Sequence, residues 1–333
     1  MMKIDMFCHI LTPKYKEEFY RITPDNFYLK NVIDSLPTLF DLDHRFRIMD
    51  KYPDLAHVLT LGLPPPEAIA QGEKAVELAR LANDEMAELV QKYPDKFPAA
   101  AASLPMDDVD AALEEIDRAI NELGLRGIQL LAPINDKPLD LPEYMPIYEK
   151  MVEYDLPIWV HPTRSADYPD YRTENRSRYM IFSNLGWPYE TATFMTRMVF
   201  SGVLEKYPTL KFITHHCGGM IPFLGQRMEG SYDHAVILRG AKYTQGLSKP
   251  HLDYFKMFFY DTALYGNTSA LMCGYEFCGV DHMVFATDFP FDSEYGDRYT
   301  RQTIESIERM AISEADKQKI FEGNARRLLH MEE

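Results

Sequence analysis

Three apolar segments of the chain end in a residue that can bind a metal ion or carry a proton. They are Pro157–His161, Lys211–His216 and Met283–Asp288, and a fourth, Lys3–His9, opens the chain. Imidazole and carboxylate groups are ligands of zinc and similar divalent ions, and both also act as general acids and bases. These residue types therefore predict a metal or acid–base site, provided that the four segment ends meet in space.

The segments themselves have the length and composition of buried β-strands, and similar segments recur along the chain. Further strand-like runs lie at 56–62, 97–104, 126–131 and 257–263, and helical patterns separate the runs from one another. Eight strands alternating with helices predict an α/β fold, a (β/α)8 barrel of the TIM type with parallel strands. We expect one such domain over residues 1–333, since no linker or repeat divides the chain.

In such a barrel the carboxyl ends of all strands meet at one face, which carries the functional site. His9, His161, His216 and Asp288 would therefore lie close together. The long segments near 11–45, 164–184 and 230–255 follow predicted strands, so we expect them to be βα loops over the same face. The segment 11–45 is too irregular in pattern to divide into elements.

Alternate residues of a strand share a face, which predicts where the neighbours of these ligands point. If His9 faces the barrel mouth, Phe7 lies in the lumen and Cys8 turns toward the helices. Asp5 would share the face of His9 two layers deeper, where a structural role is expected. By the same alternation His215 faces away from the site and is structural.

The role of Asp261 stays open because its face is not determined by the pattern. Asp288 is different, because an unpaired carboxylate at a buried strand end is costly, which favours a metal-binding or catalytic role.

Composition limits the partners of the protein. Among 333 residues, 46% are hydrophobic and 26% charged, as in ordinary globular proteins. The formal net charge of −16 argues against nucleic acid, and an anionic substrate would need a local cation. The apolar runs are too short to span a membrane. The N-terminus has no signal-peptide core and the four cysteines have no Cys-x-x-Cys spacing, so a reduced, cytoplasmic protein is expected.

At this point the chain resembles a known family, the amidohydrolase superfamily, in the branch of aminocarboxymuconate-semialdehyde decarboxylase and γ-resorcylate decarboxylase. The resemblance runs over nearly the whole chain. The segments that carry it are Ile4–Leu11, Lys92–Phe97, Ser103–Met106, Leu123–Gln129, Leu156–Pro162, Gly186–Thr191, Ser201–Lys211, His216–Gly219, Phe285–Phe291 and Gly323–Ala325.

The resemblance implies one divalent metal, zinc or manganese, bound by His9, His161 and Asp288. It implies that His216 contacts a metal-bound water as acid or base. It also implies that Arg227 clamps a substrate carboxylate from a neighbouring subunit, and hence a homo-oligomer, a dimer or tetramer. The chain departs from the branch at Phe7, where the branch has His or Glu.

The function that this resemblance implies is metal-dependent, non-oxidative decarboxylation of a small unsaturated or aromatic carboxylic acid. His216 and Asp288 would be the catalytic pair, with Arg164 holding anionic groups and Trp187 and Phe291 contacting a planar substrate. Two alternatives stay open. The same residues would serve hydrolysis of a lactone or amide, with or without metal, and a chain that has lost catalysis would only bind a small acid.

Overall fold

The computed structural model describes residues 2–240 and 246–331, and its strands are all parallel. The strands are β1 (Lys3–Ile10), β2 (Leu55–Leu61), β3 (Ala99–Ala100), β4 (Ala102–Ser103), β5 (Ile128–Ala132), β6 (Ile158–Pro162), β7 (Phe212–Thr214), β8 (Phe259–Asp261) and β9 (Met283–Val284). Each of the eight predicted strand segments contains a strand. β3 and β4 share the segment 97–104, and β7 and β9 are shorter than expected.

Hydrogen bonds connect the strands into a ring, as expected for the barrel. The ladders are β1-β2-β3 and β4-β5-β6-β7-β8-β9. They join at Ala101, whose N–H donates to Leu59 at 2.9 Å, while the next N–H, of Ala102, donates to Gly127 at 2.8 Å. At the other seam the N–H of His9 donates to the carbonyl of Phe289 at 2.8 Å. The predicted α/β barrel is therefore confirmed, with its regular ladder interrupted at two places.

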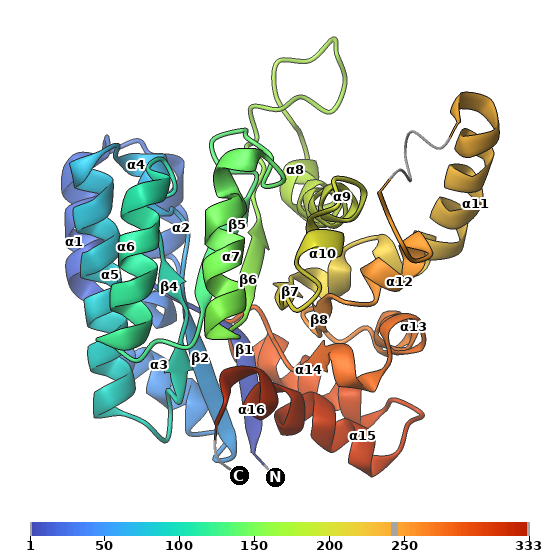
Figure 1. The fold of residues 1–333 in the computed structure, drawn as a ribbon. Coiled ribbons are helices and arrows are strands. Elements are labelled where there is room, and N and C mark those ends of the chain that lie inside the picture. The colour runs from blue at the N-terminus through green and yellow to red at the C-terminus, as the bar shows by residue number, and fades with distance from the viewer. Residues whose placement is uncertain (1, 241–245, 332–333) are drawn as a thin grey trace.

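Helices surround this ring (Figure 1). They are α1 (Pro13–Ile22), α2 (Tyr28–Asp34), α3 (Leu42–Met49), α4 (Pro66–Ile69), α5 (Glu73–Lys92), α6 (Val109–Asn121), α7 (Met145–Tyr154), α8 (Ile181–Asn184), α9 (Gly186–Phe200), α10 (Val203–Lys206), α11 (Ile221–Arg239), α12 (His251–Phe255), α13 (Thr268–Cys278), α14 (Asp297–Glu308), α15 (Glu314–Gln318) and α16 (Asn324–Leu329). Short single turns, mostly 3-10, lie at Pro37–Leu39, Pro142–Tyr144, His216–Gly218, Val280–His282 and Lys319–Gly323.

The segments expected to be long loops are partly helical. Residues 11–45 contain α1, α2 and the start of α3, so this segment covers the barrel as ordered structure. The first part of segment 230–255 continues α11, which extends away from the rest of the molecule in Figure 1, and residues 241–245 lie outside the described residues. Segment 164–184 has no helix before α8 and is a loop as expected.

The barrel interior is filled by side chains. Phe7 and Trp159 are completely buried there, and the indole Nε1–H of Trp159 donates to the carbonyl of Met6 at 2.6 Å. Leu328 of α16 belongs to the same cluster, so the C-terminal helix packs against the interior residues. The prediction that Phe7 lies in the lumen is confirmed. Among the described residues, no helix has the length and apolarity needed to cross a membrane.

Candidate active site

Four buried ligand-type side chains converge where the strands end. His9 is at the end of β1, His161 is in β6, His215 follows β7 and Asp288 follows β9. One donor atom from each lies within 4.8 Å of a donor atom from every other. His9, His161 and Asp288 therefore meet at the carboxyl ends of the parallel strands, as predicted.

The backbone around Asp288 is held in an uncommon conformation. Asp288 has φ 64°, a left-handed value that costs energy for a residue with a side chain. The preceding residue is anchored, because the N–H of Thr287 donates to Asp5 Oδ1 at 3.1 Å and its hydroxyl donates to Asp5 Oδ2. The structural role expected for Asp5 is therefore that of holding the strand end that carries Asp288.

The expected orientation of Asp5 is wrong, however. Its carboxylate lies within 4.8 Å of Cys8 Sγ and of His57, not on the face of His9. The cause is an irregularity in β1, since Asp5 pairs with His57 but Cys8 pairs with Leu59, so that one residue is extra. A bulge of this kind shifts the alternation of side chains by one residue.

Several buried ring nitrogens of the site have no hydrogen-bond partner. The group comprises His9 Nε2, His161 Nδ1, His215 Nε2 and His216 Nδ1. The other nitrogen of His9, Nδ1, is 3.1 Å from the Thr60 hydroxyl, which fixes the ring so that Nε2 faces Asp288 Oδ1 at 3.3 Å. Buried polar atoms are normally paired, and a divalent metal held by Asp288 would give unpaired ring nitrogens of this cluster a partner. The residues present fit such an ion.

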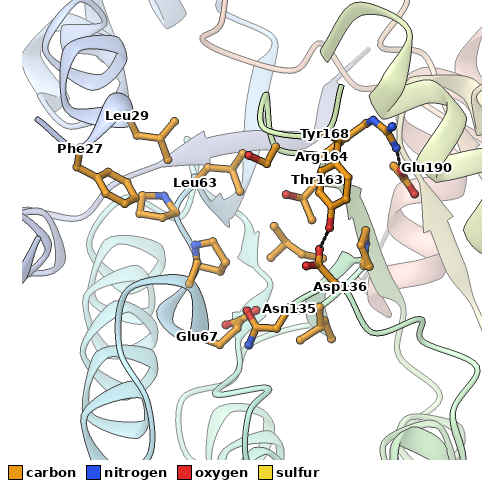
Figure 2. A pocket seen from close by; sticks show the side chains of 17 residues that line it. Phe27, Leu29, Leu63, Glu67, Asn135, Asp136, Thr163, Arg164, Tyr168 and Glu190 are labelled. Atoms are coloured by element: carbon orange, nitrogen blue, oxygen red, sulfur yellow. Dashed lines mark hydrogen bonds and ion pairs between the residues drawn. The ribbon is translucent and has the colours of Figure 1, made fainter. Parts of the chain in front are cut away.

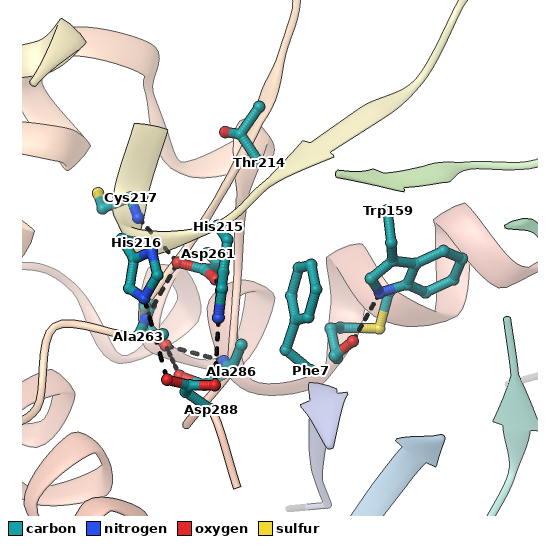
Figure 3. A network of polar contacts seen from close by, with 12 residues as sticks. Phe7, Trp159, Thr214, His215, His216, Cys217, Asp261, Ala263, Ala286 and Asp288 are labelled. Carbon is teal, nitrogen blue, oxygen red and sulfur yellow. Dashed lines mark hydrogen bonds and ion pairs between the residues drawn. The ribbon is translucent and has the colours of Figure 1, made fainter. Parts of the chain in front are cut away.

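His215 is the main correction to the sequence analysis. Its side chain does not face away from the site: Nε2 lies 3.3 Å from Asp288 Oδ1, and Nδ1 is bonded to Asp261 (Figure 3). Strand alternation does not apply here, because β7 ends at Thr214 and a tight turn begins at His216 with φ 53°. Both neighbouring histidines therefore reach Asp288.

The turn after His216 depends on glycine. Gly219 has φ 62°, and a Cβ atom there would lie 2.1 Å from the carbonyl oxygen of Pro188. Only glycine allows this approach, which brings α9 against the turn. The near neighbour of the turn is thus the backbone of α9.

Asp261, whose role the sequence left open, belongs to the site. It is fully buried, and besides His215 it accepts the N–H groups of Cys217 at 2.8 Å and Ala263 at 3.1 Å. It thus fixes both the turn and the ring of His215.

His216 is the second histidine beside Asp288, with Nε2 3.9 Å from Oδ2. Burial lowers the pKa of His216 to about 4, and the neighbouring His215 adds to this effect. For Asp288, burial alone would raise the pKa, but His215 and His9 outweigh it and hold it well below its usual range.

Two further residues, which no sequence pattern indicates, act on the site. The hydroxyl of Tyr265 donates to Asp288 Oδ2 at 2.6 Å. Arg45 is 1% exposed, donates to the backbone carbonyl of His9 and lies over the ring of Phe289 at 4.7 Å. Tyr265 comes from a loop and Arg45 from the segment that showed no regular pattern, so neither had a periodic signal.

Two of the predicted substrate-binding residues border the ligand cluster. The ring of Trp187 is 5.6 Å from that of His161, and the ring of Phe291 is 5.4 Å from that of His9. The structure thus places both aromatic rings next to the ligand cluster.

Arg164 faces a neighbouring cavity of about 360 Å³, shown in Figure 2. The cavity lies at the carboxyl ends of β2, β5 and β6, where Leu63, Leu131 and Thr163 line it. The guanidinium of Arg164 is already paired, because Nη1 donates to Glu190 Oε1 at 2.6 Å.

Arg227 does not join the site within this chain. It lies exposed on α11, the helix that extends away from the barrel in Figure 1. The role implied for it requires a second subunit, so it stays a prediction.

Comparison with known proteins places the chain in a family. The chain belongs to the amidohydrolase family, whose model matches residues 4–331. It is 34% identical over 297 residues to a γ-resorcylate decarboxylase of Polaromonas sp., with 87% of each chain covered. It is 30% identical to a 2-amino-3-carboxymuconate-6-semialdehyde decarboxylase of Dictyostelium discoideum, covering 79% of this chain and 69% of that one.

Solved structures point the same way. A dihydroxybenzoic acid decarboxylase from Polaromonas sp. JS666, with bound manganese and the inhibitor 2-nitroresorcinol, aligns with TM-score 0.82 and 29% identity over 99% of this chain and 97% of that chain. The decarboxylase branch expected from the sequence is thus confirmed.

Proposed function

We propose that this protein is a metal-dependent decarboxylase of a small aromatic carboxylic acid of the hydroxybenzoate type. The observation that carries the proposal is the convergence of His9, His161 and Asp288 at the barrel mouth, with ring nitrogens that have no other partner. Relatives that bind or decarboxylate dihydroxybenzoates support the substrate class. The proposal includes one barrel domain over residues 1–333, in the cytoplasm.

His9, His161 and Asp288 would hold the ion. Manganese is the first choice, because a similar structure contains it, and zinc is the second, because imidazole and carboxylate also suit zinc. When bound, such an ion supplies Lewis-acid chemistry toward the oxygens of the substrate.

The protein's own residues position the substrate and move one proton. In the reaction the bond between the ring carbon and the carboxylate breaks, CO2 leaves, and the electron pair left on the carbon takes up a proton. Asp288 and His216 face one another, and Tyr265 bonds the same carboxylate, so these groups would take up one proton from water in each turnover and deliver it to the carbon. Trp187 and Phe291 would contact the faces of the planar ring and exclude water.

Cationic groups outside the cluster would bind the remaining negative charge. Arg164 lines the adjoining cavity, and Arg227 would reach the site only from a second copy of the chain in a homo-oligomer. Both groups would offset the repulsion that a protein of net charge −16 exerts on an anion.

The test is to load the protein with Mn²⁺ or Zn²⁺, supply hydroxybenzoic acids one at a time, and measure CO2 together with the mass of the product. We expect CO2 release from the wild type, a loss of roughly 10³-fold or more in Asp288→Asn, and no change in the exposed control Asp253→Asn. Full activity of Asp288→Asn would overturn the assignment. A product that gains water instead of losing CO2 would assign the same site to hydrolysis.

A further inference from the structure

The imidazole of His215 is fixed by a hydrogen bond and by contacts with two neighbouring rings. Its Nδ1 is bonded to the buried carboxylate of Asp261, and its ring is stacked on Phe7 with centroids 4.2 Å apart and an interplanar angle of 23°. The ring of His216 covers it at 4.0 Å. These contacts fix the direction of the second nitrogen, Nε2.

That nitrogen points into the ligand cluster and has no hydrogen-bond partner there (Figure 3). It lies 3.3 Å from Asp288 Oδ1, the distance that also separates His9 Nε2 from the same oxygen. Two ligands of one tetrahedral ion, each about 2.0–2.2 Å from it, are roughly 3.3–3.6 Å apart. The nitrogens of His9 and His215 therefore stand at ligand spacing from Asp288 without forming hydrogen bonds to it.

We infer that His215 is a fourth protein ligand of the metal ion, alongside His9, His161 and Asp288, and that Asp261 is its positioning residue. The inference rests on the proposed function, which assigns an ion to this site. A carboxylate bonded to the far nitrogen of a ligating histidine fixes the ring and its tautomer and strengthens the ligand. Asp261 has this relation to His215 and has a further two backbone N–H donors to hold it in place.

Phe7 lies beside the ligand cluster at a position that supplies no metal ligand. Its side chain points toward the cluster from β1, with ring centroids 6.0 Å from His9 and 6.4 Å from His161, but phenyl carbon cannot bind a metal. His215 lies directly against that ring. The chain thus obtains from the turn after β7 the donor that the Phe7 position of β1 does not supply.

His216 provides the contrast within the same turn. Its Nε2 is 3.9 Å from Asp288 Oδ2, and it is not among the four residues whose donor atoms all lie within 4.8 Å of one another. We therefore expect His216 to act on the substrate and His215 to act on the ion.

The first experiment counts ligands in the unaltered protein. X-ray absorption at the manganese or zinc edge of the loaded wild type should show outer-shell scattering from three imidazoles, where two would overturn the inference. This measurement does not depend on activity or on the folding of any variant.

The second experiment compares Mn²⁺ affinity among variants, measured by the electron paramagnetic resonance signal of free Mn²⁺. We expect His215→Ala to weaken binding at least about 100-fold and Asp261→Asn to weaken it about 10–100-fold. The matched control, His216→Ala, should bind Mn²⁺ like the wild type. In the double variant Phe7→His with His215→Ala, the new imidazole enters the space that the removed ring leaves, and affinity should recover by at least tenfold over His215→Ala.

The outcomes separate this inference from the proposed function. Unchanged Mn²⁺ affinity in His215→Ala, in a protein that still needs metal to release CO2, would overturn the inference and leave the function standing. A wild type that binds neither Mn²⁺ nor Zn²⁺ would overturn both. Loss of affinity in His216→Ala as large as in His215→Ala would show that the turn as a whole, and not His215, is needed.

Discussion

Tyr265 donates a hydrogen bond of 2.6 Å to Asp288 Oδ2, the oxygen that also faces His216. The phenol ring is stacked on Tyr299 with centroids 3.9 Å apart, so its position does not depend on this hydrogen bond alone. The proposed catalytic carboxylate is therefore oriented from a loop beyond β8 as well as from its own strand.

Removal of the Tyr265 hydroxyl should impair catalysis without unfolding the protein. In Tyr265→Phe the stacked ring stays and Asp288 loses one donor, so we expect kcat to fall roughly 10–100-fold with a small change in KM. Steady-state measurement of CO2 release checks this. Tyr299→Phe keeps the same stacking and serves as the control. Equal activity of Tyr265→Phe and wild type would limit Tyr265 to packing.

Loading with metal should stabilise the fold, because the ion binds only the assembled cluster. At an ion concentration 100-fold above Kd the gain is about 2.7 kcal/mol, which corresponds to a rise in Tm of several degrees. Thermal unfolding of chelator-treated protein, with and without Mn²⁺, measures it. Ca²⁺, which prefers oxygen ligands, should give no comparable rise at a site rich in imidazole.

Glu67 makes the stability of the protein depend on pH. It is 6% exposed, its Oε2 has no hydrogen-bond partner, and burial raises the pKa of its carboxyl from 4.5 to about 8. Between these two pH values the folded protein holds a proton that the unfolded chain has lost. The contribution of Glu67 to stability is therefore complete below pH 4.5 and is lost as pH rises toward 8. The loss from this one group is roughly 2–5 kcal/mol.

The amide in Glu67→Gln cannot ionise, so this variant should lack the pH-dependent contribution of Glu67 to stability. We expect urea unfolding between pH 5 and 9 to show a difference in the free energy of unfolding between the variant and the wild type. This difference should grow in favour of the variant as pH rises and stay constant above pH 8. Glu88→Gln, an exposed carboxylate on α5, should leave the pH profile as it is. Parallel profiles for Glu67→Gln and wild type would mean that Glu67 is ionised in the folded protein.

Arg164 should affect substrate binding more than chemistry, because it lines the cavity at the carboxyl ends of β2, β5 and β6. For Arg164→Gln we expect KM to rise about tenfold or more with kcat nearly unchanged. Arg172→Gln, at an exposed position of the same loop, is the matched control. If KM does not rise, the guanidinium serves only its ion pair with Glu190.

Much of this architecture follows from sequence pattern. Apolar runs that end in His9, His161 and Asp288 predict parallel strands whose ends meet, and the structure confirms this meeting. The prediction was possible because a short buried strand and its polar last residue are both visible in the local sequence. The fold was predictable for the same reason: alternation of strand and helix depends on neighbours in the chain.

Only the tertiary structure decided the positions of residues that lie at bulges, strand ends and loops, where the regular sequence pattern stops. A bulge in β1 moved Asp5 away from the face of His9, and the end of β7 turned His215 into the site. Tyr265 arrives from a loop, whose course is determined by packing and not by any repeat. Side chains alternate along a strand only while its hydrogen-bond ladder is regular. The sequence by itself therefore determined that this protein has a site at its strand ends. The packing of the chain decided which side chains complete that site.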